Sequence, residues 1–587
     1  MNKLLMNNIS DKKIIDTIFL LMSFSLAFNN IPKTVQMNFV GGVLGNKLIF
    51  YPFIIGLIYT VYLYKNDKIK LPNLHKFLKF LFIYSLIVIV SLILGMINYP
   101  YYDLIVNGPI MKIEKLSMIL SAFKQLGINL DEKIFIYIYM IAKLFKSVLS
   151  EILYAFCGAY MIYCWYYYDW QRGFKVLIKG IMIALFVMFF YNIIEISYLA
   201  GSSNAENLLK KITPYFHTIK TSFNWWPPIL WKGQLRSYFS EPSNYGTYFA
   251  VVMPLLWYLV YYYQNILKKF NFGICIIFFT FCLFLTKART AVALFTGEFI
   301  IFFLVIIILR NERYLKNFLL VILCSFLAFG LSNIFIFHYM QASKVINTKV
   351  INTLEPEKST VTVKQHNNKK GVMEISKKNT IEEIKNIYNL DKKTNKVHVN
   401  KIQEYFENNL FSIASLNKRS NLARYSTIIA DFKIGLDNPM LGIGSGLRNA
   451  YVIEYLPQMS KSNNEVKHWI NLQKKEGILK SGFPNLCEYT YRFAETGILG
   501  LSVFLLPAVV LLKKLLRKIK NKNMEFNLKI IYIHFTIAFI GIMASAIGST
   551  INATYFYWLL LGLGYAMCFG KENDVKDNGD TGSRQEY

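Results

Sequence analysis

The sequence predicts an all-α polytopic membrane protein with about twelve transmembrane helices and one large extracytoplasmic loop that contains short helices. The 587 residues are 54% hydrophobic and only 17% charged, whereas soluble domains carry about 25% charged residues. The apolar residues also lie in long blocks, such as the uncharged run from Ile300 to Leu309. Only helices or closed barrels satisfy the backbone in lipid, and the alternation typical of a barrel is absent from the sequence.

Windows of about 20 apolar residues define the predicted spans. They cover residues 14–30, 48–64, 77–97, 147–167, 177–199, 243–263, 271–286, 290–309, 316–338, 486–512, 527–547 and 551–570. The chain therefore divides into four parts. About nine N-terminal helices fill residues 1–338, the large loop covers 339–483, about three helices fill 484–570, and 571–587 form a polar tail.

The net charge of +30 could suggest a nucleic-acid partner, but the basic residues gather between the apolar blocks. That distribution is typical of cytoplasmic loops, and the densest group is KKLLRKIKNK at residues 513–522. It predicts that both termini are cytoplasmic and that the protein lies in the cytoplasmic (inner or plasma) membrane, without nucleic acid. The first apolar run ends in Phe28-Asn29-Asn30 and lacks a small-residue cleavage site, so we interpret it as a retained span.

The large loop divides into two halves. Its first half, to about Asn408, is a polar insert in which Thr380 to Glu383 form a capping-box pattern. In the second half, Ser420 can cap a helix that Gly435 ends. The cysteines show no disulfide framework and no CxxC pair, and the histidines show no metal-binding spacing. We therefore predict no metal and no cofactor.

Arginines on the outer side are candidate anion ligands, because the guanidinium group binds phosphate or carboxylate with two parallel hydrogen bonds. Lys far outnumbers Arg in this chain, so each Arg is informative. Arg289, with Lys287, lies between two apolar spans, where a charge is costly without a partner or a function. The alternative is a side chain that only reaches to the interface. The six outer arginines are Arg236, Arg289, Arg419, Arg424, Arg448 and Arg492.

A second group of charges precedes the span at 243–263. Glu241 and Arg236 lie there on the predicted outer side, and Pro242 suits the first position of a helix with Ser240 or Glu241 as its cap. The structural interpretation is a helix start and nothing more. The functional interpretation is that Glu241 acts as a carboxylate base or as an orienting group, with Arg236 close by.

Two further motifs surround the end of the large loop. The run Gly442 to Gly446 lacks the strand that a dinucleotide-binding loop requires, so we predict a tight turn in which Gly444 and Gly446 approach a ligand. Glu495 opens the following span, as a site residue or as a solvated charge. We predict that the loop from Ser420 to Gly446 forms a lid over the site.

Taken in order, these motifs resemble the O-antigen polymerase and O-antigen ligase superfamily (Wzy-like). The resemblance covers about residues 230–505. It rests on R-x-x-F-x-E-P-S at 236–243, T-x-A-R-T-A at 286–291, Arg424 on a loop helix, N-P-x-x-G-x-G-x-G at 438–446 and A-E-T-G-I-L-G at 494–500. The histidine that ligases carry near the end of the loop is missing from Phe483-Pro484-Asn485, which favours a polymerase.

The resemblance implies a metal-independent membrane glycosyltransferase that makes O-antigen, capsule or exopolysaccharide. It would join oligosaccharide units carried on undecaprenyl diphosphate at the outer face of the membrane, beside membrane lipid, a flippase and a chain-length regulator. The implied catalytic residues are Glu241, Arg289 and Arg424. The implied substrate-binding residues are Arg236, Lys287, Gly444, Gly446, Arg448 and Glu495. A ligase-like glycan transferase and a flippase for lipid-linked oligosaccharide are the alternatives.

Overall fold

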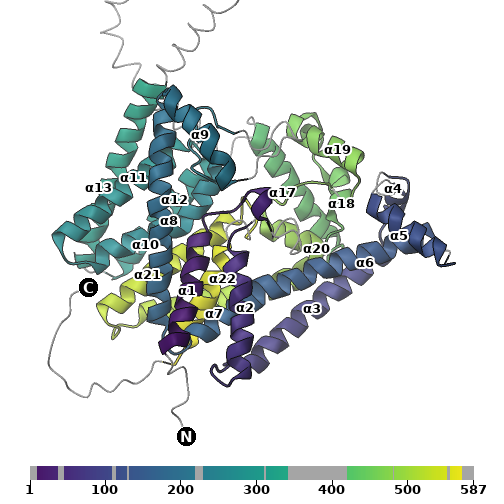
Figure 1. Cartoon of the computed structure of the whole chain (residues 1–587), viewed down its shortest axis with the longest axis horizontal. Helices are drawn as coiled ribbons and strands as arrows, with labels where there is room; N and C mark the ends of the chain where they lie inside the picture. The colour runs from purple at the N-terminus through teal and green to yellow at the C-terminus, as the bar shows by residue number, and fades with distance from the viewer. Residues whose placement is uncertain are drawn as a thin grey trace, which may run out of the picture.

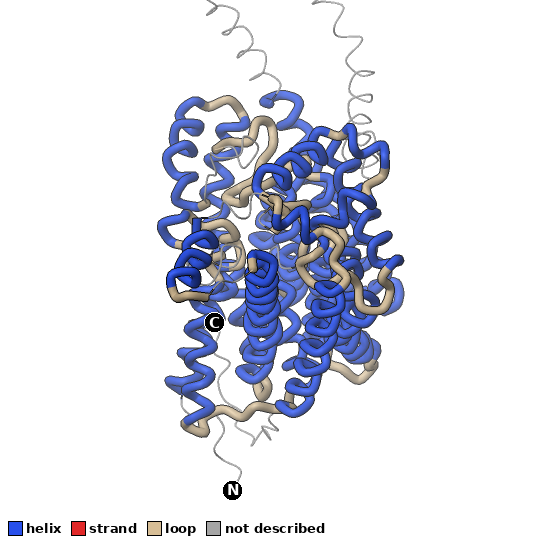
Figure 2. Tube along the Cα trace, turned by 90° about the vertical axis from the view of Figure 1, so that its right-hand side faces the viewer, coloured by secondary structure: helices blue, strands red, loops and turns tan. Residues whose placement is uncertain are grey.

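The computed structural model describes residues 9–36, 45, 47–108, 114–128, 131–217, 229–309, 312–340, 419–479, 481–551 and 555–571. Within these ranges all regular elements are helical and no strand occurs, as the predicted all-α class requires. The helices of the bundle lie side by side in both views, and α3 and α6 lean outward from it toward α4 and α5 (Figures 1 and 2).

The N-terminal part begins with α1 (Ile9–Ser25), α2 (Phe50–Lys65) and α3 (Leu74–Ile97). Three helices, α4 (Tyr102–Val106), α5 (Glu114–Gln125) and α6 (Glu132–Glu151), precede η4 (Ile152–Cys157) and α7 (Gly158–Tyr166). Then follow α8 (Trp170–Leu199), α9 (Ser203–Phe216), α10 (Pro242–Tyr262), α11 (Ile266–Leu285), α12 (Arg289–Leu309), α13 (Glu312–Phe335) and η5 (Ile336–Met340). After the loop come α20 (Glu488–Lys520), α21 (Phe526–Ser545) and α22 (Phe556–Phe569).

Each of the predicted spans falls on a helix, but fewer of these helices qualify as spans. In the described residues eight helices are long and apolar enough to cross a membrane, compared with the twelve predicted from sequence. They are Leu74–Ile97, Ile134–Tyr166, Trp170–Leu199, Ile266–Leu285, Arg289–Leu309, Glu312–Met340, Glu488–Lys520 and Phe526–Ser545. The helices α1, α2 and α22 are only 17, 16 and 14 residues long.

The fourth exception is α10, which has 21 residues but is rich in tyrosine and is buried on almost every side. It packs against α11, α12 and α21 and forms the centre of the bundle. Gly541 of α21 permits close contact there, since a Cβ atom at this position would lie 2.3 Å from the carbonyl oxygen of Ala250. Side chains of α10 therefore serve helix packing rather than contact with lipid.

The described part of the large loop forms a small helical unit that packs on α20, at the upper right of Figure 1. It consists of α17 (Arg419–Asp437), α18 (Arg448–Tyr455), η7 (Gln458–Ser462) and α19 (Asn464–Glu476), which are the green helices of Figure 1. Ala423, Val452, Trp469 and Phe483 contribute to its own hydrophobic core. The predicted helix is thus confirmed, but its ends differ: it begins at Arg419, so Ser420 is not its cap, and it continues past Gly435 to Asp437. The polar insert and the capping-box pattern at Thr380 lie outside the described residues.

Candidate functional site

Arg289 and Arg424 lie at a junction of three helices. Arg289 is the first residue of α12, and its Nη1 donates a hydrogen bond of 2.7 Å to Oδ1 of Asn421 on α17. One turn later on α17, Nη1 of Arg424 donates a bond of 2.6 Å to the carbonyl oxygen of Gly548, which follows α21. Both arginines are half-buried. The loop helix is therefore tied to the ends of two spans by the two arginines that sequence analysis implied.

Glu241 belongs to the same cluster. It is the N-cap residue of α10, as predicted, with Pro242 at the first helical position. Its Oε2 accepts a hydrogen bond of 3.0 Å from Oγ of Ser243. Burial raises the pKa of the Glu241 carboxyl, and the nearby positive charge of Arg424 partly opposes that rise. A half-buried carboxyl with a raised pKa is a better proton acceptor than an ordinary glutamate, because a stronger base holds the proton.

Close packing of α10 against α12 fixes Glu241 relative to Arg289. A Cβ atom at Gly246 would lie 2.4 Å from Cβ of Ala291, so only glycine permits this approach. The turn that leads into α12 is also ordered: Oγ1 of Thr286 donates to the carbonyl of Leu283 (2.6 Å) and accepts from the amide of Ala288 (3.1 Å). This turn holds Lys287 in the left-handed region, with φ of 49°.

Arg236 makes a separate set of contacts, next to Leu235, whose amide donates a hydrogen bond of 3.0 Å to the carbonyl of Leu285 at the end of α11. Glu195 of α8 accepts hydrogen bonds from the backbone amides of Arg236 (3.0 Å) and Ser237 (2.7 Å). Arg236 is only 1% exposed, and its guanidinium group donates to the carbonyl of Ile229. Burial lowers the pKa of Arg236, and the charge of Glu195 counteracts this. Sequence reasoning missed Glu195, although a carboxylate inside an apolar span is a recognisable signal of a specific partner.

The glycine run forms the predicted tight turn, but the groups it approaches belong to the protein. Within α20, Gly497 has a φ of 63° and interrupts the helix. The amides of Ile498 and Leu499 donate to the carbonyls of Pro439 (2.8 Å) and Met440 (3.3 Å). In return, the carbonyls of Ala494 and Glu495 accept from Ile443 (3.0 Å) and Gly444 (2.9 Å). The turn thus provides hydrogen-bond partners for the backbone amides and carbonyls of α20 that lose their partners within the helix at the interruption.

Glu495 completes this joint. Its two carboxylate oxygens accept hydrogen bonds from the amide of Gly446 (2.8 Å) and from Oγ of Ser445 (3.1 Å). Gly442, with φ of 67°, admits no side chain, because a Cβ atom would lie 2.4 Å from the carbonyl carbon of Glu495. The interruption of α20 at Gly497 was not predicted from the sequence. Gly444, Gly446 and Glu495 connect the loop to a span.

Arg448 lies in the core of the loop unit. It forms an ion pair with Asp431 of α17 through two hydrogen bonds of 2.5 Å and 3.0 Å, and the two side chains are 2% and 1% exposed. Its Nη1 also donates to the carbonyl of Phe483 (3.0 Å). Asp431 is two turns beyond Arg424 on the same face of α17. The pair holds α18 and the loop exit on α17.

Arg492 lies in another internal network. Its Nε donates to Glu488 (2.6 Å), its Nη1 donates to the hydroxyl of Tyr84 (3.0 Å), and its Nη2 pairs with Glu151. The network connects α20 to α3 and α6, so its role is to join spans.

The structure therefore brings Glu241, Arg289 and Arg424 together, with Lys287 two residues from Arg289. Of the other implied residues, Arg236, Arg448, Glu495 and the two glycines make contacts within the protein. Asn421 and the carbonyl of Gly548 are site members that sequence reasoning missed, because an uncharged residue and a backbone oxygen carry no pattern. In the described ranges no group of three His, Cys, Asp or Glu side chains could hold a metal ion. Comparisons with family models, curated proteins and solved structures found no match.

Proposed function

We propose that this protein is a polysaccharide polymerase that joins oligosaccharide units carried on undecaprenyl diphosphate at the outer face of the cytoplasmic membrane. The observation that carries the proposal is the meeting of Glu241, Arg289 and Arg424. One carboxyl and two guanidinium groups, drawn from the starts of α10 and α12 and from the loop helix α17, form one half-buried cluster.

The cluster suits a displacement at a sugar carbon. A hydroxyl oxygen of the acceptor unit attacks the anomeric carbon of the donor, and the bond from that carbon to the diphosphate oxygen breaks. The bonding electrons leave with the diphosphate, whose added negative charge Arg289 and Arg424 stabilise without a metal ion. Glu241 accepts the proton of the hydroxyl group. The hydrogen-bond acceptors of Arg289 and Arg424 at this junction, Asn421 and the Gly548 carbonyl, are uncharged.

The test replaces each arginine in the producing cell and measures chain length. Arg289→Gln and Arg424→Gln should each reduce polymerisation by roughly 10²–10³-fold, the usual effect of removing one donor to a developing negative charge. Single carrier-linked units should accumulate while protein remains in the membrane. Arg517→Gln, an exposed arginine near the end of α20, is the matched control and should make long chains.

Two outcomes would contradict the proposal. Wild-type chain length in both arginine variants would exclude the cluster as the site of polymerisation. Long chains that remain on undecaprenyl diphosphate when the gene is deleted would instead indicate the ligase activity of the resembling superfamily.

A further inference from the structure

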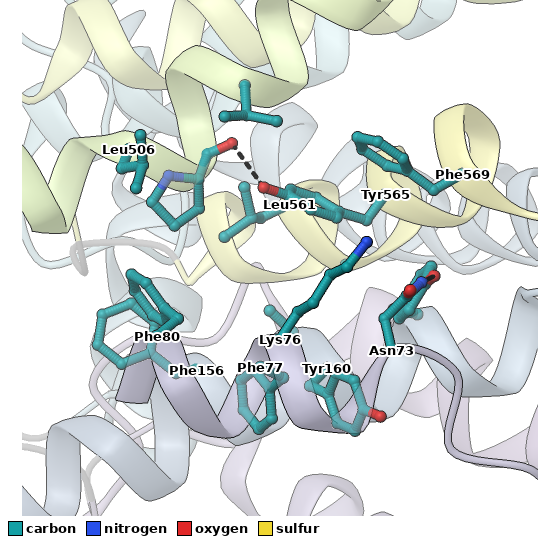
Figure 3. Close-up of a pocket in the computed structure, with 15 residues that line it drawn as sticks. Asn73, Lys76, Phe77, Phe80, Phe156, Tyr160, Leu506, Leu561, Tyr565 and Phe569 are labelled. Carbon is teal, nitrogen blue, oxygen red and sulfur yellow. Dashed lines mark hydrogen bonds between the residues drawn. The ribbon is translucent and has the colours of Figure 1, made fainter. Parts of the chain in front are cut away.

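A cavity of about 370 Å³ lies between α3, α7, α20 and α22 (Figure 3). Its wall is mainly aromatic and aliphatic, and its polar members include Asn73 and Lys76 at the start of α3. None of the described residues that line it is acidic. The principal aromatic members are Phe77, Phe80, Phe156, Tyr160, Tyr565 and Phe569.

The cavity is at the opposite end of the bundle from the arginine cluster. Gly95, near the other end of α3, packs against the backbone of Ile443 in the loop unit. Lys76 precedes Gly95 by 19 residues of helix, which correspond to about 28 Å. A donor whose diphosphate contacts Arg289 and Arg424 therefore cannot place the same group at Lys76.

One lysine, Lys76, lines this cavity, and two more lie beside the end of α22 that borders it. The side chain of Lys76 extends between the helices toward Tyr565 and Phe569 (Figure 3). From α20, Nζ of Lys514 lies 5.4 Å from the centre of the Phe569 ring. Lys514 and Lys518 are both close enough to Cys568 for their charges to act on its thiol. The cavity thus combines an apolar interior with positive charge from two helices.

We propose that this cavity binds an anionic phospholipid from the leaflet on its own side of the membrane. The phosphate would contact Lys76 and Lys514, and part of an acyl chain would occupy the aromatic interior. Basic pockets between transmembrane helices recognise anionic headgroups in this way. A free anion would use the lysines but not the apolar wall, so the shape of the cavity favours a lipid. The site is independent of the proposed polymerase activity.

The test uses the full-length protein in detergent and native mass spectrometry. Dioleoyl-phosphatidylglycerol, dioleoyl-phosphatidylcholine and inorganic phosphate are titrated separately. The anionic phosphatidylglycerol should bind more tightly than the zwitterionic phosphatidylcholine. Lys76→Gln or Lys514→Gln should each lower the affinity for phosphatidylglycerol roughly fivefold, as expected for one basic residue near an anionic surface. Lys175→Gln, exposed near the start of α8, is the control and should have no effect.

A second variant tests the interior without changing charge. Val510 lines the cavity, so a tryptophan side chain in Val510→Trp should fill it. Binding of phosphatidylglycerol should then weaken, although the charges of Lys76 and Lys514 are unchanged. Equal affinity for the two lipids, or unchanged affinity in Lys76→Gln and Val510→Trp, would overturn the proposal. Displacement of phosphatidylglycerol by equimolar inorganic phosphate would also overturn it, because it would indicate a simple anion site.

Discussion

Replacing Arg448 with leucine should open the loop unit, because Asp431 would lose its cation inside the core. The pair is almost fully buried, with side chains 2% and 1% exposed. Removing one member of such a pair costs about 3–5 kcal/mol, which is roughly a 10²–10⁴-fold change in an opening equilibrium. Hydrogen exchange of the amides in α17 and α18 reports that equilibrium directly. We expect their protection factors to fall by this factor in Arg448→Leu.

The double variant Asp431→Leu/Arg448→Leu separates a buried ion pair from a general packing defect. It removes both charges, so it should retain more protection than Arg448→Leu alone. Recovery should be partial, because the carbonyl of Phe483 loses the hydrogen bond that Arg448 donates. Protection losses that simply add in the double variant would refute the reasoning, as would unchanged exchange in Arg448→Leu.

The pH dependence of the single variant follows from the carboxyl group left behind. Burial raises the pKa of Asp431, and Arg448 opposes this rise in the native protein. In Arg448→Leu the pKa of Asp431 in the folded protein lies above its pKa in the unfolded chain. At low pH the buried carboxyl group is therefore neutral and needs no cation. The damage should therefore be small below the ordinary aspartate pKa and grow as the pH rises above it. Protection factors corrected for intrinsic exchange should differ more from wild type at pH 8 than at pH 5.

Three further predictions concern the site and its supports. Because burial raises the pKa of Glu241, polymerisation activity should rise with pH above the range in which an ordinary glutamate titrates. In Arg424→Gln the positive charge that lowers this pKa is gone, so the residual activity should rise at a still higher pH. Gly442→Ala should lower the thermal midpoint of the purified protein, whereas Gly297→Ala, with open space at its Cβ position, should leave it unchanged or raise it. Glu195→Ala should release the turn at residues 236–237 and increase its protease sensitivity, whereas Glu195→Gln should retain much of its order.

Apolar blocks allowed the helices of the bundle to be predicted from sequence, since length and hydrophobicity are local properties. Such blocks do not show whether lipid or protein surrounds a helix, and α10 illustrates this. Its sequence satisfied the prediction of a span, yet Trp257 and four of its five tyrosines are buried where it packs against α11, α12 and α21. The difference between eight candidate spans and twelve arises from helices of this kind and from short helices.

Arginines at the ends of spans were also predictable, because an isolated charge beside an apolar block needs a partner. The identity of each partner was not. Asn421 is 132 residues from Arg289, and Gly548 is 124 residues from Arg424. Arg424 and Arg448 look alike in sequence, but Arg424 meets a neutral carbonyl at a half-buried position whereas Arg448 meets a carboxylate in a core. Tertiary packing, which has no local signature, separates the candidate site residue from the structural one.

The same packing changes how α17 should be viewed. The loop from Ser420 to Gly446 was predicted from sequence to cover the site as a lid. The two ends of α17 are both attached to spans. Asn421 and Arg424 tie its first turns to α12 and α21. The glycine turn that follows it exchanges four backbone hydrogen bonds with the interruption in α20.

A helix held at both ends acts as a brace that sets the position of Arg424 against Arg289 and Glu241. Gly442→Ala should then lower polymerisation as well as stability, although Gly442 contacts no member of the cluster. Chain length measured at a temperature where the variant remains folded tests this. Normal polymerisation in a folded Gly442→Ala protein would show that the glycine turn does not position Arg424.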